Sequence, residues 1–148
     1  MPACFLIAAA HSSALDSETN NWSLFSLIEQ LQVTVSSQLP TLEGVVLPYE
    51  IHVFWELRPE EIDREFQFRL VSRQENEEKK SDAFTITSDK TRYRLRLVGL
   101  PIRFRGRSEL LVEWRAGETD DWQRCSAYWP LEVDLLVDEA VRAPESTQ

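Results

Sequence analysis

Hydrophobic and polar residues alternate along five segments of the chain. In each segment, hydrophobic side chains occupy every second position, and mostly polar or charged side chains lie between them. A period of two, in segments rich in β-branched and aromatic residues, is typical of strands that bury one face. We therefore predict strands within residues 49–57, 64–72, 83–88, 92–97 and 109–115.

A sixth alternating segment, "WQRCSAYWPLEVDLLV", covers residues 122–137. Its hydrophobic parity includes Cys125, Trp129 and Leu135, whereas Pro130 falls on the polar parity. Proline has no backbone N–H to donate, so it rarely occupies the middle of a central strand. We therefore predict that this strand lies at a sheet edge or is broken by a bulge at Pro130.

The segment "WSLFSLIEQLQVTV", residues 22–35, fits two interpretations. The hydrophobic stripe of a helix would comprise Leu24, Leu27, Ile28, Leu31 and Val35. A strand broken at Glu29 would instead align Phe25, Leu27, Leu31, Val33 and Val35. Because the neighbouring segments are strands and "QVTV" favours β-structure, we favour the strand.

Turn-like or charged stretches separate the predicted strands, and no long helical pattern lies between them. They cover residues 58–61, 73–82, 87–90, 105–107 and 116–121. Strands at this spacing are typical of antiparallel sandwiches. We predict one all-β domain over residues 1–138, an antiparallel β-sandwich of seven to eight strands with an immunoglobulin-like or jelly-roll-like architecture. The polar tail, residues 139–148, is expected to fray.

Three stretches of the first half of the chain carry a family resemblance. They are "ACFLI", "WSLFSLIEQL" and "LPTLEGVVLPYEIHVFWEL", with a hydrophobe–acid–x–hydrophobe pattern at residues 28–31. In these features the chain resembles an uncharacterised family of small bacterial all-β proteins. The resemblance implies a β-sandwich and supplies no assigned activity and no functional residues.

The overall charge narrows the range of partners. The formal net charge is −9, with 43% hydrophobic and 28% charged residues, as in soluble globular proteins. A net negative surface repels nucleic-acid phosphates, so nucleic acid is an unlikely partner. No apolar run reaches the roughly 18–20 residues of a membrane helix. The short run at residues 4–10 lacks the positive start of a signal peptide, so we expect a soluble cytoplasmic protein rather than a secreted one.

Catalytic and metal-binding motifs are sparse. His11, after the first strand in a small-residue loop, and His52, on the polar parity of its strand, are the two histidines, and we expect His52 to face solvent. The carboxylates of "ETDD", residues 118–121, fit an ordinary turn better than a calcium site. We expect no enzymatic activity, cofactor or metal. Cys4 and Cys125 are expected to be buried free thiols, with a strand-to-strand disulfide as the alternative.

A stripe of six arginines and no acid, "TRYRLRLVGLPIRFRGR", covers residues 91–107 of this acidic chain. Gly99 and Pro101 fit a bulge or bend that would switch the parity between the two halves and divide the arginines into two patches. One interpretation is a solvated strand face. On that interpretation, acids on other strands would pair with the arginines: Glu65, Glu113, Glu132 and Asp134. The other is an interface with an acidic protein patch.

Two aromatic residues add to this surface, because Trp122 and Tyr128 lie at or near the start of the last strand, on its polar parity. We predict a non-enzymatic protein-interaction or scaffold module that binds an unidentified protein partner or itself. The alternative is a carbohydrate-binding module that uses exposed aromatic rings. The candidate interface comprises Arg92, Arg94, Arg96, Arg103, Arg105, Arg107, Trp122 and Tyr128.

Overall fold

The computed structural model describes residues 2–38 and 41–138, which form a β-sandwich. The strands are β1 (Ala3–Leu15), β2 (Trp22–Leu27), β3 (Gln30–Ser36), β4 (Val46–Glu56), β5 (Phe66–Gln74), β6 (Glu77–Lys80), β7 (Phe84–Ile86), β8 (Arg92–Pro101), β9 (Gly106–Arg115) and β10 (Gln123–Asp138). A short 3₁₀ helix, η1 (Pro59–Glu61), follows β4. No helix in these residues is long and apolar enough to cross a membrane.

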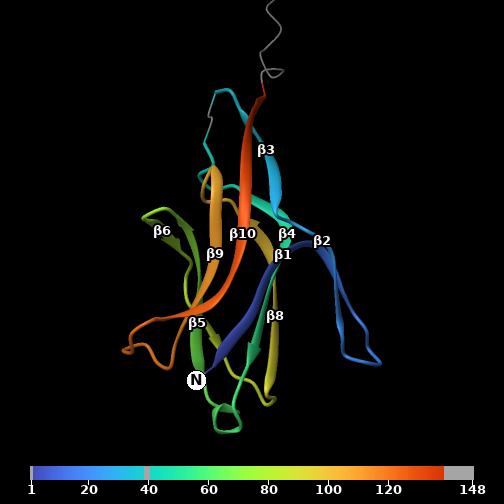
Figure 1. Ribbon diagram of the computed structural model, residues 1–148, viewed down its shortest axis with the longest axis vertical. Coiled ribbons are helices and arrows are strands. Elements are labelled where there is room, and N and C mark those ends of the chain that lie inside the picture. The colour runs from blue at the N-terminus through green and yellow to red at the C-terminus, as the bar shows by residue number, and fades with distance from the viewer. Residues whose placement is uncertain (1, 39–40, 139–148) are drawn as a thin grey trace, which may run out of the picture.

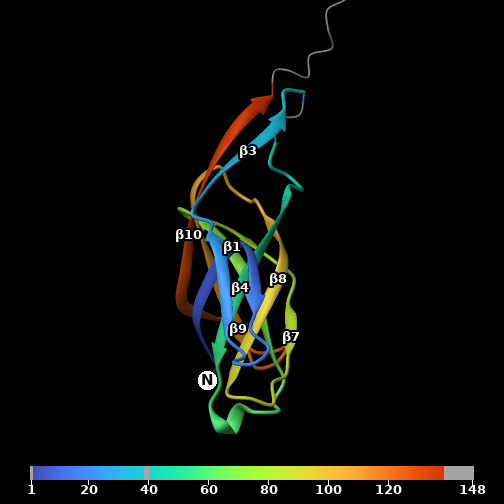
Figure 2. The same ribbon diagram turned by 90° about the vertical axis from the view of Figure 1, so that its right-hand side faces the viewer.

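Two sheets pack face to face (Figures 1 and 2). The first sheet has the order β2-β1-β4-β8, and the second has β3-β10-β9-β5-β6, with β7 also paired to β5. All pairs are antiparallel except β3 with β10, which run parallel. The core contains one face of each sheet, and its largest members, Trp55 of β4 and Phe68 of β5, are fully buried with their rings in contact. The predicted β-sandwich is thus confirmed.

The described residues hold more strands than the predicted seven to eight. Residues 22–35 are indeed extended, but they form two strands, β2 and β3, in different sheets. The chain changes sheet at Ile28, whose N–H bonds the carbonyl of Ala9 and whose carbonyl accepts the Trp129 indole N–H at 2.7 Å. The break at Glu29 was therefore correctly placed, although one strand was expected to continue through it.

The last strand was predicted to lie at a sheet edge or to be broken at Pro130, and the edge position is wrong, because β10 lies between β9 and β3. Pro130 pairs with Glu109 of β9, and pairing with β3 begins only at Glu132. Proline is therefore tolerated, since at that point β10 has a strand partner on one side only. The irregularity in register lies earlier, between Arg124 and Tyr128. The tail, 139–148, lies outside the described residues.

Candidate protein-binding surface

The first arginine row lies on the outer face of β8, which is an edge strand of the first sheet. Arg96 donates from Nε to the Glu50 carboxylate at 2.7 Å, and Arg94 donates to the Asn20 carbonyl at 2.8 Å. Arg92 is exposed. Charged side chains on an edge strand also discourage edge-to-edge aggregation. Most of this row therefore serves the fold itself.

Glu50, the partner of Arg96, belongs to a buried polar cluster that the sequence pattern did not predict. Glu50 is 5% exposed and His52 is 2% exposed, although His52 was expected to face solvent. The Glu50 carboxylate accepts from Ser13 at 2.6 Å and lies 3.0 Å from His52 Nε2. Burial alone would raise the pKa of Glu50, but the hydrogen bonds from Ser13, His52 and Arg96 outweigh it and lower that pKa.

The β1–β2 hairpin explains why this outer face is buried. In Figure 2 the hairpin lies in front of β4 and β8, and the Trp22 ring meets the His52 ring edge-on at 5.6 Å. The same hairpin supplies Ser13 and the Asn20 carbonyl. The other histidine, His11, was expected in a loop after the first strand, but it lies within β1 because that strand continues to Leu15.

The second arginine row lies where the chain crosses from the first sheet to the second. Leu97 and Leu100 both pack in the core, so the expected parity switch at "VGLP" is confirmed. The switch in parity occurs at Gly99, whose φ is +110°, a conformation that residues other than glycine rarely adopt. The chain then crosses through residues 102–105 to β9. The first arginine row therefore belongs to the first sheet, whereas Arg103 and Arg105 lie on the connection and Arg107 lies in β9 of the second sheet.

Backbone contacts fix the direction of the crossing side chains. Ile102 donates its N–H to Val45, and Lys79 Nζ donates to the Arg103 carbonyl at 3.0 Å. Ile102 and Phe104 are buried, so the alternating Arg103 and Arg105 side chains point to solvent. The core side chains thus hold two guanidinium groups on the surface next to each other.

These arginines line a pocket of about 580 Å³, which we call the basic pocket. Lys79 of β6 adds a third cation, and its ammonium lies 4.7 Å from the centre of the Phe104 ring. Among the described lining residues, Glu43 is the one acid. These residues are Thr41, Leu42, Glu43, Gly44, Lys79, Ile102, Arg103, Arg105 and Leu135.

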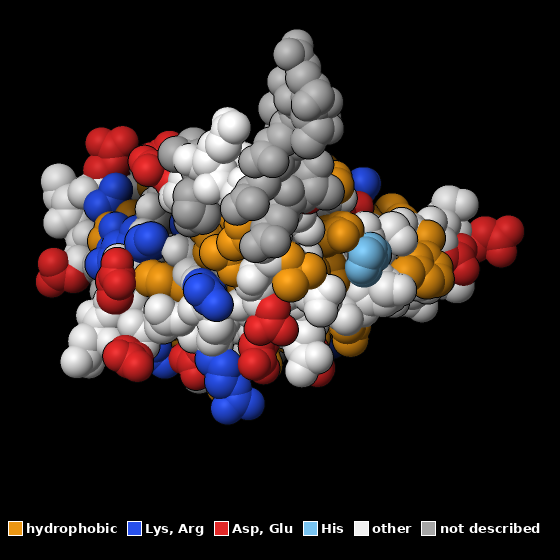
Figure 3. Space-filling model, turned by 90° about the horizontal axis from the view of Figure 1, so that it is seen from above, with side chains coloured by type: hydrophobic (Ala, Val, Ile, Leu, Met, Phe, Trp, Pro, Cys, Tyr) orange, Lys and Arg blue, Asp and Glu red, His pale blue; other side chains and the backbone are white. Residues whose placement is uncertain are grey.

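Within the described part of the chain, the cations of the basic pocket differ from Arg69, Arg73, Arg96 and Arg124, each of which pairs with a carboxylate. No carboxylate there forms an ion pair with Lys79, Arg103 or Arg105. Figure 3, which looks down on this end of the molecule, shows basic and acidic side chains together on the left, the side on which Figure 1 places β6. With three cations and one acid among its described lining residues, the basic pocket is a local excess of positive charge on an acidic protein.

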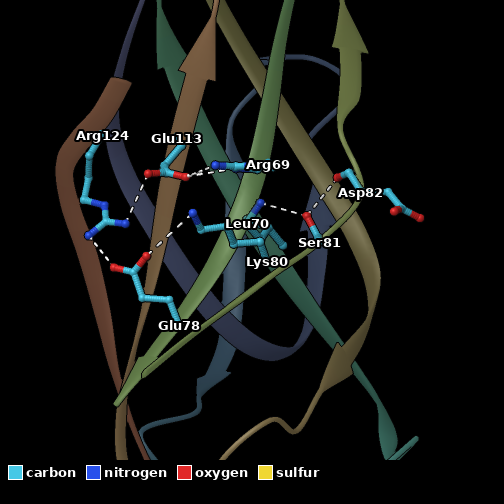
Figure 4. Close-up of polar contacts among 8 residues, drawn as sticks. All are labelled: Arg69, Leu70, Glu78, Lys80, Ser81, Asp82, Glu113 and Arg124. Atoms are coloured by element: carbon cyan, nitrogen blue, oxygen red, sulfur yellow. Dashed lines mark hydrogen bonds and ion pairs between the residues drawn. The ribbon is translucent and has the colours of Figure 1, made fainter. Parts of the chain in front are cut away.

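The outer face of the second sheet shows the opposite arrangement, because its cations are paired (Figure 4). Glu113 accepts from Arg69 at 2.9 Å and from Arg124 at 3.1 Å, and Arg124 also pairs with Glu78. The hydrogen bond from Arg124 outweighs desolvation and lowers the pKa of Glu78. Glu113 was expected to pair with the arginine stripe, and that prediction is wrong. Glu113 instead pairs with Arg69 of β5 and Arg124 of β10.

Among the acid partners expected for the stripe, Glu132 alone lies near one of its arginines in the described residues. Arg107 Nε is 3.9 Å from its carboxylate, and the Arg107 side chain is 90% exposed. Exposed pairs of this length contribute little to stability. Arg107 therefore stays available to a partner.

The two predicted aromatic residues occupy separate places on the second sheet. The Trp122 ring lies against the guanidinium groups of Arg69 and Arg115, each 4.2 Å from the ring centre. Tyr128 is 56% exposed and lines a groove of about 840 Å³ together with Arg107. Trp122 lies beyond the far end of β9 from the basic pocket, about 30 Å away at strand spacing.

Sequence reasoning missed Lys79, because residues 73–82 were expected to form a loop. They instead form the end of β5, a turn and β6, which carries Lys79 to the Arg103 carbonyl. The charged, non-alternating sequence "EEKK" carries no strand signal, so pairing with β5 alone makes it a strand.

Comparison with known proteins supplies no functional analogy. No protein-family model matches the chain, and no curated protein matches it in sequence. Within residues 2–38 and 41–138, no group of three or more His, Cys, Asp or Glu side chains is placed to hold a metal ion.

Proposed function

We propose that this protein is a protein-interaction module whose basic pocket binds an acidic, extended segment of a partner protein. The observation that carries this proposal is the contrast in charge pairing. The cations of the second sheet's outer face are paired with acids or amides of the fold, whereas Lys79, Arg103 and Arg105 have no acid partner in the described residues.

Electrostatics favours a carboxylate-bearing ligand at this position. Lys79, Arg103 and Arg105 line one concave surface. The Lys79 ammonium binds the Arg103 carbonyl, and the Val45 carbonyl binds the Ile102 N–H, so the backbone that carries the two arginines needs little ordering on binding. Each exposed charge pair contributes roughly 0.2–1 kcal/mol, so three of them together change affinity by about tenfold. The resulting interaction is weak and strongly dependent on salt.

The same features favour an acidic protein segment over nucleic acid. Single-stranded nucleic acids bind by stacking bases on exposed aromatic rings. The aromatic residue of this region, Phe104, is 6% exposed and lies beneath Lys79. A long polyanion is also repelled by the rest of a chain with net charge −9, whereas a short acidic segment contacts only the basic pocket.

Binding of a fluorescently labelled oligoglutamate peptide, measured by anisotropy in about 0.01 M salt, tests this proposal because the Debye length there is about 30 Å. The Arg103→Glu/Arg105→Glu variant is expected to bind about tenfold or more weakly than wild type. The control Lys90→Glu/Arg92→Glu makes the same change of charge on other exposed cations. It is expected to weaken binding less, because the length of β8 separates these cations from the basic pocket.

Three results would count against the proposal. They are an absence of peptide binding by the wild type, equal losses in the two double variants, and tighter binding of a labelled single-stranded oligonucleotide than of the peptide. Circular dichroism of both variants confirms that the sandwich is intact, so that a loss of binding reports on the surface.

A second candidate function is carbohydrate binding in the groove beside Tyr128. Its supporting observation is an exposed ring next to hydrogen-bonding side chains, including Arg73 and Gln74. A glycan array compares wild type with Tyr128→Ala. Binding that disappears in the variant would favour this function, and an array without hits would exclude it.

A further inference from the structure

The two cysteines meet across the sandwich. Cys4 belongs to β1 of the first sheet and is 4% exposed, and Cys125 belongs to β10 of the second sheet and is half-buried. Both belong to the same hydrophobic core, and each thiol lies close enough to the other to shift its pKa. The sequence alone could not establish this proximity, because the two residues lie near opposite ends of the chain.

Local irregularities in both strands accompany this contact. The register of β1 against β4 shifts between Cys4 and Leu6, and the register of β10 against β9 shifts between Arg124 and Tyr128, on either side of Cys125. β-Bulges of this kind bend a strand and redirect side chains. The two irregular segments lie on strands that contact each other, β1 and β10.

The two thiols are chemically unequal. The neighbouring Cys125 thiol and burial both raise the pKa of Cys4. The neighbouring Cys4 thiol lowers the pKa of Cys125, although burial opposes this. Because the thiolate is the reactive form of cysteine, the more exposed Cys125 is the group that reacts first with an oxidant.

We propose that Cys4 and Cys125 form a redox-active pair that closes into a disulfide between the two sheets when a peroxide oxidises Cys125. The Cys125 thiolate attacks one oxygen of hydrogen peroxide, the O–O bond breaks, and hydroxide leaves. Cys125 is then a sulfenic acid. The Cys4 sulfur attacks the Cys125 sulfur, the S–O bond breaks, and the departing hydroxide takes up the Cys4 proton. Overall, two thiols and one peroxide give one disulfide and two waters.

The disulfide would join two sheets and enclose most of the chain in one loop. A cross-link over a long loop restricts the unfolded chain strongly and so raises the melting temperature. For a domain of this size we expect a rise of about 10 °C. Oxidation would therefore strengthen the sandwich without changing its outer surface.

Intact mass spectrometry and thermal unfolding of the wild-type protein test the proposal before and after treatment with a small excess of hydrogen peroxide. We expect a loss of two hydrogens, a peptide map that links Cys4 to Cys125, and a higher melting temperature that dithiothreitol reverses. Met1 is the only methionine, so any sulfoxide is located in the same map.

Two cysteine variants serve as controls. Cys125→Ser and Cys4→Ala are expected to show no linked peptide and no rise in melting temperature on oxidation. The proposal is overturned if peroxide adds only oxygen to the wild-type cysteines, or if both thiols remain free to alkylation in denaturant. It is also overturned if Cys125→Ser shows the same thermal shift as wild type.

Discussion

Replacing Glu50 by Gln tests the buried polar cluster beneath the β1–β2 hairpin. Glutamine keeps the shape of the side chain and removes the charge that accepts hydrogen bonds from Ser13, His52 and Arg96. Hydrogen bonds to charged groups contribute about 1.5–3 kcal/mol each, and glutamine can keep part of them. The Arg96 side chain is 46% exposed and is rehydrated when its partner is lost, so we expect a total cost of about 2–3 kcal/mol.

The cost of this substitution should depend on pH. Hydrogen bonds hold the pKa of Glu50 below its ordinary value despite burial. An acid whose pKa is lowered in the folded state stabilises the fold above the pKa of the unfolded chain, and that contribution is lost as pH falls through the folded-state pKa. The difference between wild type and Glu50→Gln should therefore be complete at neutral pH and shrink below about pH 4.

Urea unfolding at neutral and acidic pH measures both effects, with Glu109→Gln as the matched control. Glu109 also pairs with an arginine, Arg73, but its side chain is 38% exposed. Exposed pairs contribute at most about 1 kcal/mol, so the control should lose less than half as much stability. Equal losses in the two variants, or a Glu50→Gln loss that does not change with pH, would show that the buried Glu50 carboxylate does not stabilise the fold through its charge.

Two further predictions concern the points where the chain changes direction. Gly99→Ala should lower the free energy of unfolding by about 1–3 kcal/mol, because φ is +110° and a new Cβ would lie 3.2 Å from Val46 Cγ1. Gly44→Ala, with a φ of +74° and open space around it, should cost less, about 1 kcal/mol, in the same urea titration. Trp129→Phe removes the indole donor to the Ile28 carbonyl and should cost about 1–2 kcal/mol, measured by thermal unfolding.

Alternation along the chain predicted which residues share a face of a strand, and these assignments agree with the structure. Ile51, Val53 and Trp55 are buried together on one face of β4, as expected. Alternation could not reveal that the opposite face is also covered, because the cover comes from a hairpin distant in sequence. For this reason His52 was placed in solvent although it is 2% exposed.

The candidate surface was predicted in part. The sequence located the arginines and the switch at Gly99, because a glycine and a proline interrupt the alternation there. It did not reveal that Arg103 and Arg105 lie on a connection between sheets, or that Lys79 joins them, because both depend on how β5, β6 and β8 pack. The contact between Cys4 and Cys125 likewise depends on the packing of β1 against β10.

NMR titration of the ¹⁵N-labelled protein with oligoglutamate locates the surface at which an acidic segment is proposed to bind. We predict amide shifts concentrated in residues 41–44, 79 and 102–107, which decrease as salt rises to about 0.15 M because the Debye length falls to about 8 Å. Shifts centred on Arg92 and Arg96, or no shifts in low salt, would show that the basic pocket does not bind an acidic segment.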